Sequence, residues 1–374
     1  MGIIVYVGID VHKDQNTVCL FTREEDNLLI ELGKIPAGTE YMVKALRKAG
    51  REFFKGQDVE WKAGYEAGPT GYGLCKGLQK KGIDCEIMAP TTIIKASGER
   101  TKTDRRDAAS LAMALANGTY RPVHILDDED SSTREITRLR GSIKNKLKKE
   151  KQNLLSFLLR IGKSYPESGN YWTQKHFDWL DTVHFEDIML EYSFQAYLAE
   201  IRASMELLAR IDAKIEEIAN TERYKDNVSK LVCFTGIQTH TAVSLLCEIG
   251  DFTRFATAEQ FSAYIGLVPG QDSSGKRQCY TPITKTGNSR IRLLLTEAAK
   301  GIKNSNPFQK SKRIQARQAL ASSEIVFYAD KGSRRIKNKM SSMERNGKNA
   351  NVATTAGARE LACFVWGMMT GNIA

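Results

Sequence analysis

Four acidic residues in the first third of the chain are candidates for chemistry at a bound metal. Asp10 and Glu66 each follow an apolar run, and Asp104 and Asp107 lie three residues apart in a predicted helix, 103–116. Carboxylates that converge from two strand ends and one helix can hold two magnesium ions. Two such ions, about 3.5–4 Å apart, activate an attacking oxygen at a phosphate and stabilise the leaving oxygen. The four acids therefore indicate metal-dependent chemistry at a phosphate.

Each acid also has an ordinary structural explanation. Asp10 could begin a turn, Glu66 could end a strand, and the two aspartates could pair with neighbouring arginines at the surface. However, like charges three residues apart on a helix repel one another unless a cation offsets them. A carboxylate at the end of a buried strand is also costly unless it binds something. Because all four acids fall at suitable elements, we favour the metal site.

A second candidate is a basic, glycine-containing stretch in which Ser274 directly precedes Gly275. A serine oxygen can attack a phosphate and conserve the bond energy in a phosphoester. Basic groups nearby would stabilise the charge that develops. The basic residues of this stretch are Lys276, Arg277, Lys285, Arg290 and Arg292. On spacing alone, a loop that grips phosphates without reacting is the better explanation.

A third candidate is the segment 235–242, Thr-Gly-Ile-Gln-Thr-His-Thr-Ala. A glycine turn that opens a helix presents free backbone N–H groups, which suit a phosphate. The segment is similar to half of a helix-hairpin-helix motif. An ordinary helix start explains it equally well.

The charge of the chain indicates a polyanionic partner. The net charge is +11 over 374 residues, and the pI is near 9.2. Residues 138–151 hold seven Lys or Arg against one Glu, and residues 301–350 hold twelve against three acids. Such a surplus favours nucleic acid. A membrane surface is the alternative, but the excess is spread over long polar stretches.

Cysteine usage and hydropathy favour a cytoplasmic protein. The seven cysteines are scattered without a Cys-x-x-Cys pair, which indicates reduced thiols and makes a zinc site improbable. The first residues lack the basic lead and cleavage site of a signal peptide. No window approaches the roughly 20 apolar residues that a membrane span needs.

The elements expected in the first third form a mixed sheet with helices on its faces. Strands are predicted at 3–9, 16–21, 27–34, 59–65 and 85–88, and helices at 71–81 and 103–116. The first three strands form a meander. The alternation of strand and helix that follows is typical of parallel strands joined by helices.

The rest of the chain is expected to be mainly helical. Apolar residues between about 130 and 220 recur at three- and four-residue steps, which predicts two long helices joined by a bend at about 163–186. Their heptad-like spacing suggests an antiparallel hairpin that protrudes as an arm, or a helix pair packed on its own domain. Short helices are predicted at 229–266, a polar loop at 270–289, and helices at 291–302 and 352–369. Residues 322–348 look loose and polar.

The motifs jointly resemble a known family. They are Gly8-Ile9-Asp10-Val11-His12-Lys13, Tyr65-Glu66-Ala67-Gly68, Thr103-Asp104-Arg105-Arg106-Asp107-Ala108, Gly266-Leu267-Val268-Pro269, Ser273-Ser274-Gly275-Lys276 and Ile283-Thr284-Lys285-Thr286-Gly287-Asn288. In this order they resemble the DEDD-type transposases of bacterial insertion sequences. This is the family of RNA-guided bridge recombinases, numbered one hundred and ten among insertion sequences.

The resemblance implies a ribonuclease H-like first domain, related to RuvC resolvases, over residues 1–128. A coiled-coil arm would follow at 129–224 and a transposase domain with a catalytic serine at 225–374. Asp10, Glu66, Asp104 and Asp107 would bind Mg²⁺, for which Mn²⁺ can substitute. The catalytic serine maps onto Ser274, with Ser273 as the near competitor.

The resemblance also implies partners and a location. The family joins its two domains across protomers into composite sites, and it assembles from dimers to a tetramer on donor and target DNA. A structured bridge RNA pairs with both duplexes, and cleavage leaves a covalent serine–DNA link. The protein would be cytoplasmic in a bacterium, nucleoid-associated when active and without membrane contact.

Three other functions fit parts of the same pattern. The first is a structure-selective nuclease in which metal-activated water attacks and Ser274 only binds phosphate. The second is an actin-like ATPase or sugar kinase, since an apolar strand that ends in Gly-Ile-Asp also opens those folds. The third is a non-catalytic nucleic-acid-binding protein.

Overall fold

The computed structural model describes residues 2–24, 26–90, 103–167, 169–274, 277–306 and 309–373, without the side chains of residues 273, 274, 277 and 278. The chain divides into two compact units, Met1–Ile125 and Leu126–Ala374. The three domains expected from the sequence, with boundaries at 128 and 224, stay a prediction.

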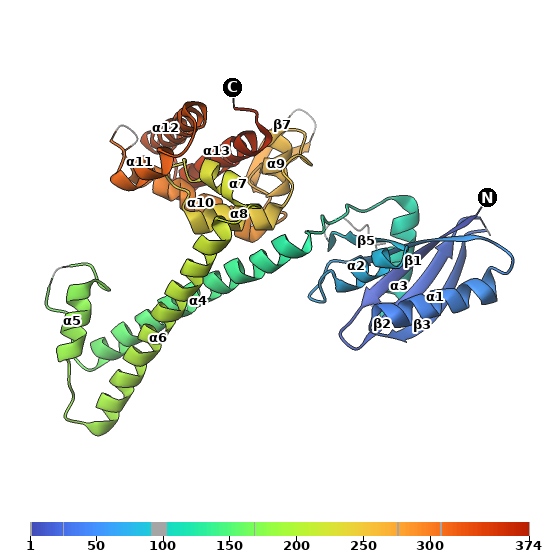
Figure 1. The fold of residues 1–374 in the computed structure, drawn as a ribbon, viewed down its shortest axis with the longest axis horizontal. Coiled ribbons are helices and arrows are strands. Elements are labelled where there is room, and N and C mark those ends of the chain that lie inside the picture. The colour runs from blue at the N-terminus through green and yellow to red at the C-terminus, as the bar shows by residue number, and fades with distance from the viewer. Residues whose placement is uncertain are drawn as a thin grey trace. The chain divides into compact units, whose positions relative to one another are not determined.

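The first unit is built on the mixed sheet that the sequence predicted. Its strands are β1 (Ile3–Val11), β2 (Gln15–Thr22), β3 (Leu28–Pro36), β4 (Val59–Glu66) and β5 (Asp84–Met88), in the order β3-β2-β1-β4-β5 (Figure 1). β1 pairs antiparallel with β2 and parallel with β4, and β4 pairs parallel with β5. The carboxyl ends of β1, β4 and β5 therefore meet at one edge of the sheet.

Helices cover both faces of this sheet. α1 (Thr39–Phe53) and α2 (Gly73–Lys80) share a core with Val5, Val7 and Ile9 of β1. α3 (Asp104–Asn117) lies on the other face, where a Cβ on Gly8 would come within 2.0 Å of the Ala108 carbonyl oxygen. Odd-numbered residues of β1 thus face α1 and α2, and even-numbered residues face α3, as the alternation of a strand requires.

α1 was not among the helices predicted from the sequence. Its buried residues are Met42, Val43, Leu46 and Ala49, which follow the three- and four-residue spacing of an amphipathic helix. The pattern was present, but only four apolar residues carry it among many charged ones. The helix is stable because this stripe packs on the sheet.

The second unit begins with the two long helices that the sequence predicted, α4 (Asp128–Arg160) and α6 (Ile188–Ala219), which pack against one another. Leu154, Phe194 and Leu198 belong to a core of their own. The segment predicted as a plain bend contains a further helix, α5 (Gln174–Thr182). Coiled-coil packing and a protruding arm stay predictions.

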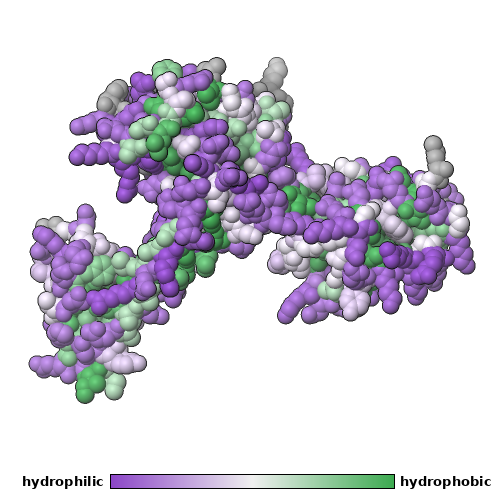
Figure 2. Space-filling view, viewed as in Figure 1, coloured by the Kyte–Doolittle hydropathy of each residue, from purple (hydrophilic) through white to green (hydrophobic). Residues whose placement is uncertain are grey.

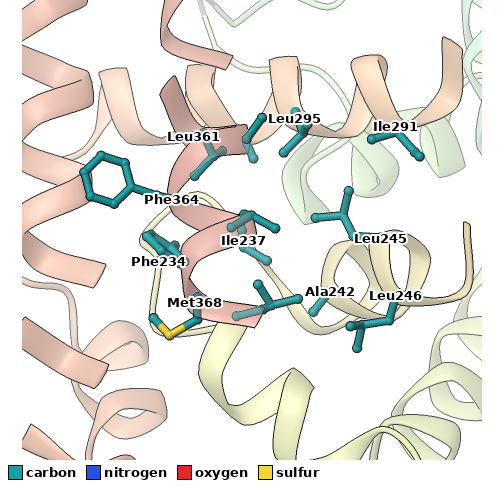
Figure 3. Close-up of a cluster of buried hydrophobic side chains, with 14 of the residues drawn as sticks. Phe234, Ile237, Ala242, Leu245, Leu246, Ile291, Leu295, Leu361, Phe364 and Met368 are labelled. Atoms are coloured by element: carbon teal, nitrogen blue, oxygen red, sulfur yellow. The ribbon is translucent and has the colours of Figure 1, made fainter. Parts of the chain in front are cut away.

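The remaining elements form a helical body around a second core. They are α7 (Lys225–Leu231), α8 (Thr239–Ile249), α9 (Ala258–Tyr264), β6 (Pro269–Ser274), β7 (Arg277–Ile283), α10 (Ser289–Asn304), α11 (Lys312–Gln318), α12 (Ser323–Arg345) and α13 (Ala350–Thr370). Figure 3 shows the core, in which Ile237 lies among side chains of α8, α10 and α13. The short helices at 229–266, the helix at 291–302 and the closing helix are confirmed.

One prediction for this body was wrong. Residues 270–289 are not a loop throughout, because β6 and β7 form an antiparallel hairpin there. Its residues are mostly polar, so the alternation of apolar and polar side chains that marks a half-buried strand is missing. The polar segment 322–348, whose structure the sequence left open, contains the continuous helix α12. Tyr328, Ile336 and Met340 are buried on one side of this helix, and its many charges occupy the exposed side.

Hydrophilic side chains cover most of the visible surface, and hydrophobic ones form small patches (Figure 2). Among the described residues, none of the helices has both the length and the apolar character needed to cross a bilayer.

Candidate metal centre

The register of the parallel strands β1 and β4 places Asp10 and Glu66 at equivalent positions of the two neighbouring strands. Gly8 pairs with Gly64, so Asp10 and Glu66 each stand two residues beyond a paired glycine. Both glycines face α3, since a Cβ on Gly64 would meet Leu115 at 3.0 Å. Residues two apart on a strand point to the same face. Asp10 and Glu66 therefore extend from adjacent strand ends on the α3 side of the sheet.

α3 supplies the other two acids. Thr103 caps the helix by accepting a hydrogen bond from the backbone N–H of Arg106, so Asp104 and Asp107 occupy the first turn. Carboxylates are favoured there by the helix dipole. Gly8 lies against Ala108, and Asp104 is one turn earlier on the same face of the helix. This turn brings Asp104 to Asp10.

Asp10 and Asp104 are joined by a third side chain, His12. Among the described residues, the ligand atoms of Asp10, His12 and Asp104 all lie within 4.8 Å of one another. His12 Nε2 is 3.1 Å from Asp10 Oδ2 and 3.9 Å from Asp104 Oδ2. His12 was not among the ligands predicted from the sequence. The only sign of His12 in the sequence was its position two residues after Asp10, because side chains two residues apart on an extended chain point to the same side.

The other two predicted ligands lie outside this cluster. Glu66 is exposed at the end of β4, and Asp107 is half-buried one turn after Asp104. Asp107 is still close enough to act on Asp10 electrostatically. The structure therefore brings two of the four predicted acids together and leaves the ligand roles of the other two as predictions. Arg105 pairs with Glu31 of β3.

The surroundings of Asp10 favour a bound cation. Burial raises the pKa of Asp10, His12 opposes the increase, and the carboxylates of Asp104 and Asp107 add to it. Thr17, which pairs with Asp10 across β1 and β2, is buried, and its Oγ1 has no hydrogen-bond partner among the residues that the structure describes. Carboxylate and hydroxyl oxygens are the ligands that hard divalent cations prefer, and an imidazole also suits transition metals. This donor set fits Mg²⁺ or Mn²⁺.

The predicted serine lies in the β6–β7 hairpin. Ser274 ends β6 and pairs with Arg277, the first residue of β7. Lys276 lies outside the described residues, as do the side chains of Ser273, Ser274 and Arg277. Lys285 follows β7 with a left-handed backbone conformation (φ 54°) and is exposed. The nucleophile and its basic surroundings stay predictions.

Two arginines of the predicted nucleic-acid set make contacts within the chain. Arg290 donates to the carbonyl oxygen of Thr137 in α4 and lies 3.7 Å from Glu248 in α8. Arg292 Nη1 donates to the carbonyl oxygens of Ile265, Thr286 and Gly287. Both side chains therefore help to hold the body together. Their predicted contact with nucleic acid is untested.

The chain is similar to known transposases. A family model described as "Transposase IS116/IS110/IS902 family" matches residues 229–314, and a DEDD-type model described as "Transposase" matches residues 7–162. A putative transposase of Sinorhizobium fredii is 32% identical over 96% of this chain and 87% of its own length. The transposase for insertion sequence element IS1533 of Leptospira borgpetersenii is 31% identical over 91% of this chain and 96% of its own length.

The five-stranded mixed sheet, its acidic cluster and these matches define a transposase with a DEDD domain. In particular, the chain belongs to the IS116/IS110/IS902 family of insertion-sequence transposases. The family resemblance seen in the sequence is thereby confirmed. Membership also favours a DNA-cleaving and DNA-joining enzyme over an ATPase, a sugar kinase or a non-catalytic binding protein.

Proposed function

We propose that this transposase cleaves and exchanges DNA strands with a Mg²⁺-binding DEDD site in its first unit and a serine nucleophile in its second. The observation that supports this most directly is the cluster of Asp10, His12 and Asp104 at the meeting point of β1 and α3. An insertion-sequence transposase must break and rejoin phosphodiesters. The cluster includes two carboxylates, and the pKa of one of them, Asp10, is raised. Such a cluster is suited to that task once a divalent cation is present.

Asp10 and Asp104 would hold the metal, with Glu66 and Asp107 completing the set from the adjacent strand end and helix turn. Bound Mg²⁺ would neutralise phosphate charge and polarise the scissile phosphodiester. His12 makes a hydrogen bond to Asp10 and would orient that carboxylate. Thr17 Oγ1 is buried beside Asp10 and would donate its hydrogen to a carboxylate or a ligand oxygen.

Ser274 would supply the attacking oxygen. In the proposed step, a bond forms between Ser274 Oγ and the scissile phosphorus as the bond from phosphorus to a deoxyribose oxygen breaks. The serine hydroxyl gives up its proton, and the released deoxyribose oxygen takes one up. The phosphoester keeps the bond energy, so a deoxyribose hydroxyl of a second strand can reverse the attack and complete the exchange.

A bridge RNA and a tetramer complete the proposal. The net charge of +11 provides a field that attracts both DNA and RNA. The helices α4 and α6 provide long surfaces on which protomers can associate. The enzyme would act in the bacterial cytoplasm, associated with the nucleoid.

Denaturing electrophoresis of labelled DNA after reaction tests the serine. We expect wild-type protein to stay attached to DNA through the phosphoester, and Ser274→Ala to abolish this attachment. Ser273→Ala is the matched control and should retain it. If protein never remains attached to DNA while cleavage continues, metal-activated water is the nucleophile and the enzyme is a nuclease of the alternative kind.

Asp104→Asn tests the metal site separately. It removes a ligand charge without shortening the side chain, so cleavage should be abolished and DNA affinity should change little. A large loss of affinity would show that Asp104 acts in folding or binding instead.

A further inference from the structure

The second unit contains a cavity of about 300 Å³ that neither the metal centre nor the serine hairpin uses. Three arginines line it: Arg140 from α4, and Arg313 and Arg317 from α11. The turn before α8 and its first residues, Gln238–His240, line the other side. Segments that are far apart in the sequence thus bring three guanidinium groups to one hollow.

The turn before α8 is anchored so that its next residues face this cavity. Phe234 and Ile237 are fully buried in the core (Figure 3). Gly236 packs on α10, where a Cβ would lie 2.0 Å from the Ala298 carbonyl oxygen. This glycine is therefore needed for close packing. The anchored turn leaves Gln238 as the N-cap of α8, and its side chain makes no capping hydrogen bond to the described residues.

An uncapped helix start presents backbone N–H groups without intrahelical partners and carries the positive end of the helix dipole. α8 has 11 residues, so this dipole is developed. The start of α8 opens on the same cavity as the arginines. Both features favour an anion there.

The arginines are only partly satisfied within the protein. Arg140 forms a two-bond pair with Asp212 of α6. Arg317 Nη1 donates to the Ile237 carbonyl oxygen at 2.6 Å, but its buried Nε has no hydrogen-bond partner in the described part of the chain. Arg313 is exposed at the rim and has no hydrogen bond or ion pair to the described residues. Two guanidinium groups therefore retain donors for a ligand.

The charge at the cavity remains positive after its acids are considered. Two carboxylates line it, but Asp212 is neutralised by Arg140, and Glu216 is exposed at the surface. The pKa of His240 is lowered to about 4, chiefly by burial and also by the charges of Arg140 and Lys144, with Asp212 acting in the opposite direction. His240 is therefore neutral at physiological pH, and its surroundings already disfavour a further positive charge.

We propose that this cavity binds a phosphate of a nucleic-acid backbone, at a site separate from the metal centre. Planar guanidinium groups and helix N-termini are the groups that proteins use to hold phosphates. The described lining has no Phe, Tyr or Trp on which a base would stack, so a phosphodiester fits better than a nucleotide bound through its base. This inference rests on the proposed function, because that function supplies DNA and RNA as the ligands.

Arg313→Gln tests this site with little risk to the fold, because the side chain is exposed. Fluorescence anisotropy would measure its affinity for a duplex DNA and, separately, for an RNA hairpin over a series of salt concentrations. Loss of one phosphate contact should weaken binding about tenfold and lower the slope of log K against log salt by about one. Lys312→Gln, on the same helix but outside the cavity, is the charge-matched control and should have a smaller effect.

The measurement should use full-length protein with Asp104→Asn in every variant and chelator in the buffer. Binding is then read without cleavage, so a failure of the phosphate site is distinct from a failure of the metal chemistry. A loss confined to DNA or to RNA supports the site and identifies its ligand, and a loss for both supports a shared phosphate contact. Equal effects of Arg313→Gln and Lys312→Gln, or no effect of Arg313→Gln, would overturn the proposal.

Discussion

Asp10→Asn should change the stability of the first unit in opposite directions with and without metal. If the proposed site binds Mg²⁺, the ion at ten times its Kd would stabilise the folded wild-type unit by RT ln 11, or about 1.4 kcal/mol. Amides of β2 that exchange only when the unit unfolds should then exchange about tenfold more slowly. Asn lacks the negative charge that would hold the ion, so the variant should lose most of this protection.

Without metal, the same substitution should stabilise the unit. Asp10 and Asp104 oxygens lie within 4.8 Å, which corresponds to a repulsion of roughly 1–3 kcal/mol for an effective dielectric constant between about 80 and 20. The attraction between Asp10 and His12 offsets part of this gain. Burial also disfavours the ionised form of Asp10, so a neutral amide avoids that cost. Metal-free Asp10→Asn should therefore exchange more slowly than metal-free wild type.

Hydrogen exchange followed by mass spectrometry on the full chain measures both effects. Asp14→Asn is the matched control, because Asp14 is an exposed carboxylate in the same turn and lies outside the cluster. It should leave the metal protection unchanged. Full protection of Asp10→Asn by Mg²⁺ would contradict a metal site at Asp10, as would faster exchange than wild type when metal is absent.

Three further predictions concern pH and packing. The pKa of folded Asp10 is raised, so its ionised form costs stability, and this cost is relieved as pH falls through that pKa. As pH is lowered, the affinity for Mg²⁺ should therefore begin to fall at a higher pH than for a site with an ordinary aspartate. Isothermal titration calorimetry at a series of pH values measures this. Glu248→Gln should lower the free energy of unfolding by about 3 kcal/mol in urea titrations, since this fully buried carboxylate pairs with Arg138. Gly8→Ala should cost about 3 kcal/mol through its clash with α3, whereas Gly73→Ala, with open space around it, should be neutral or stabilising.

Much of the first unit could be predicted from the sequence because the information there is local. The central strand β1 is continuous and apolar, which marks a strand covered on both faces. The acids at its end and at the start of α3 stand out because a charge next to such a run is costly. The long helices of the second unit were equally clear, since periodicity accumulates over many turns. The order of the motifs along the sequence was sufficient to identify the family.

Local patterns failed where packing supplied the stability. α1 is marked by only four buried residues, and α12 hides its apolar side among charges. The β6–β7 hairpin is stabilised by pairing across the turn, which leaves no apolar alternation in the sequence. In each case contacts with the rest of the fold stabilise the element, and the pattern of its own residues was not read from the sequence.

The sequence by itself determined which residues carry charge and which segments form the sheet and long helices. Only the tertiary structure decided which of those charges meet. It brought His12 between Asp10 and Asp104, left Glu66 outside their cluster, and joined Arg140 to Arg313 and Arg317 around one cavity. The physical reason is that hydrophobic periodicity records burial along a single element, whereas the separation of two side chains distant in sequence depends on strand register and helix packing, which only the folded chain defines.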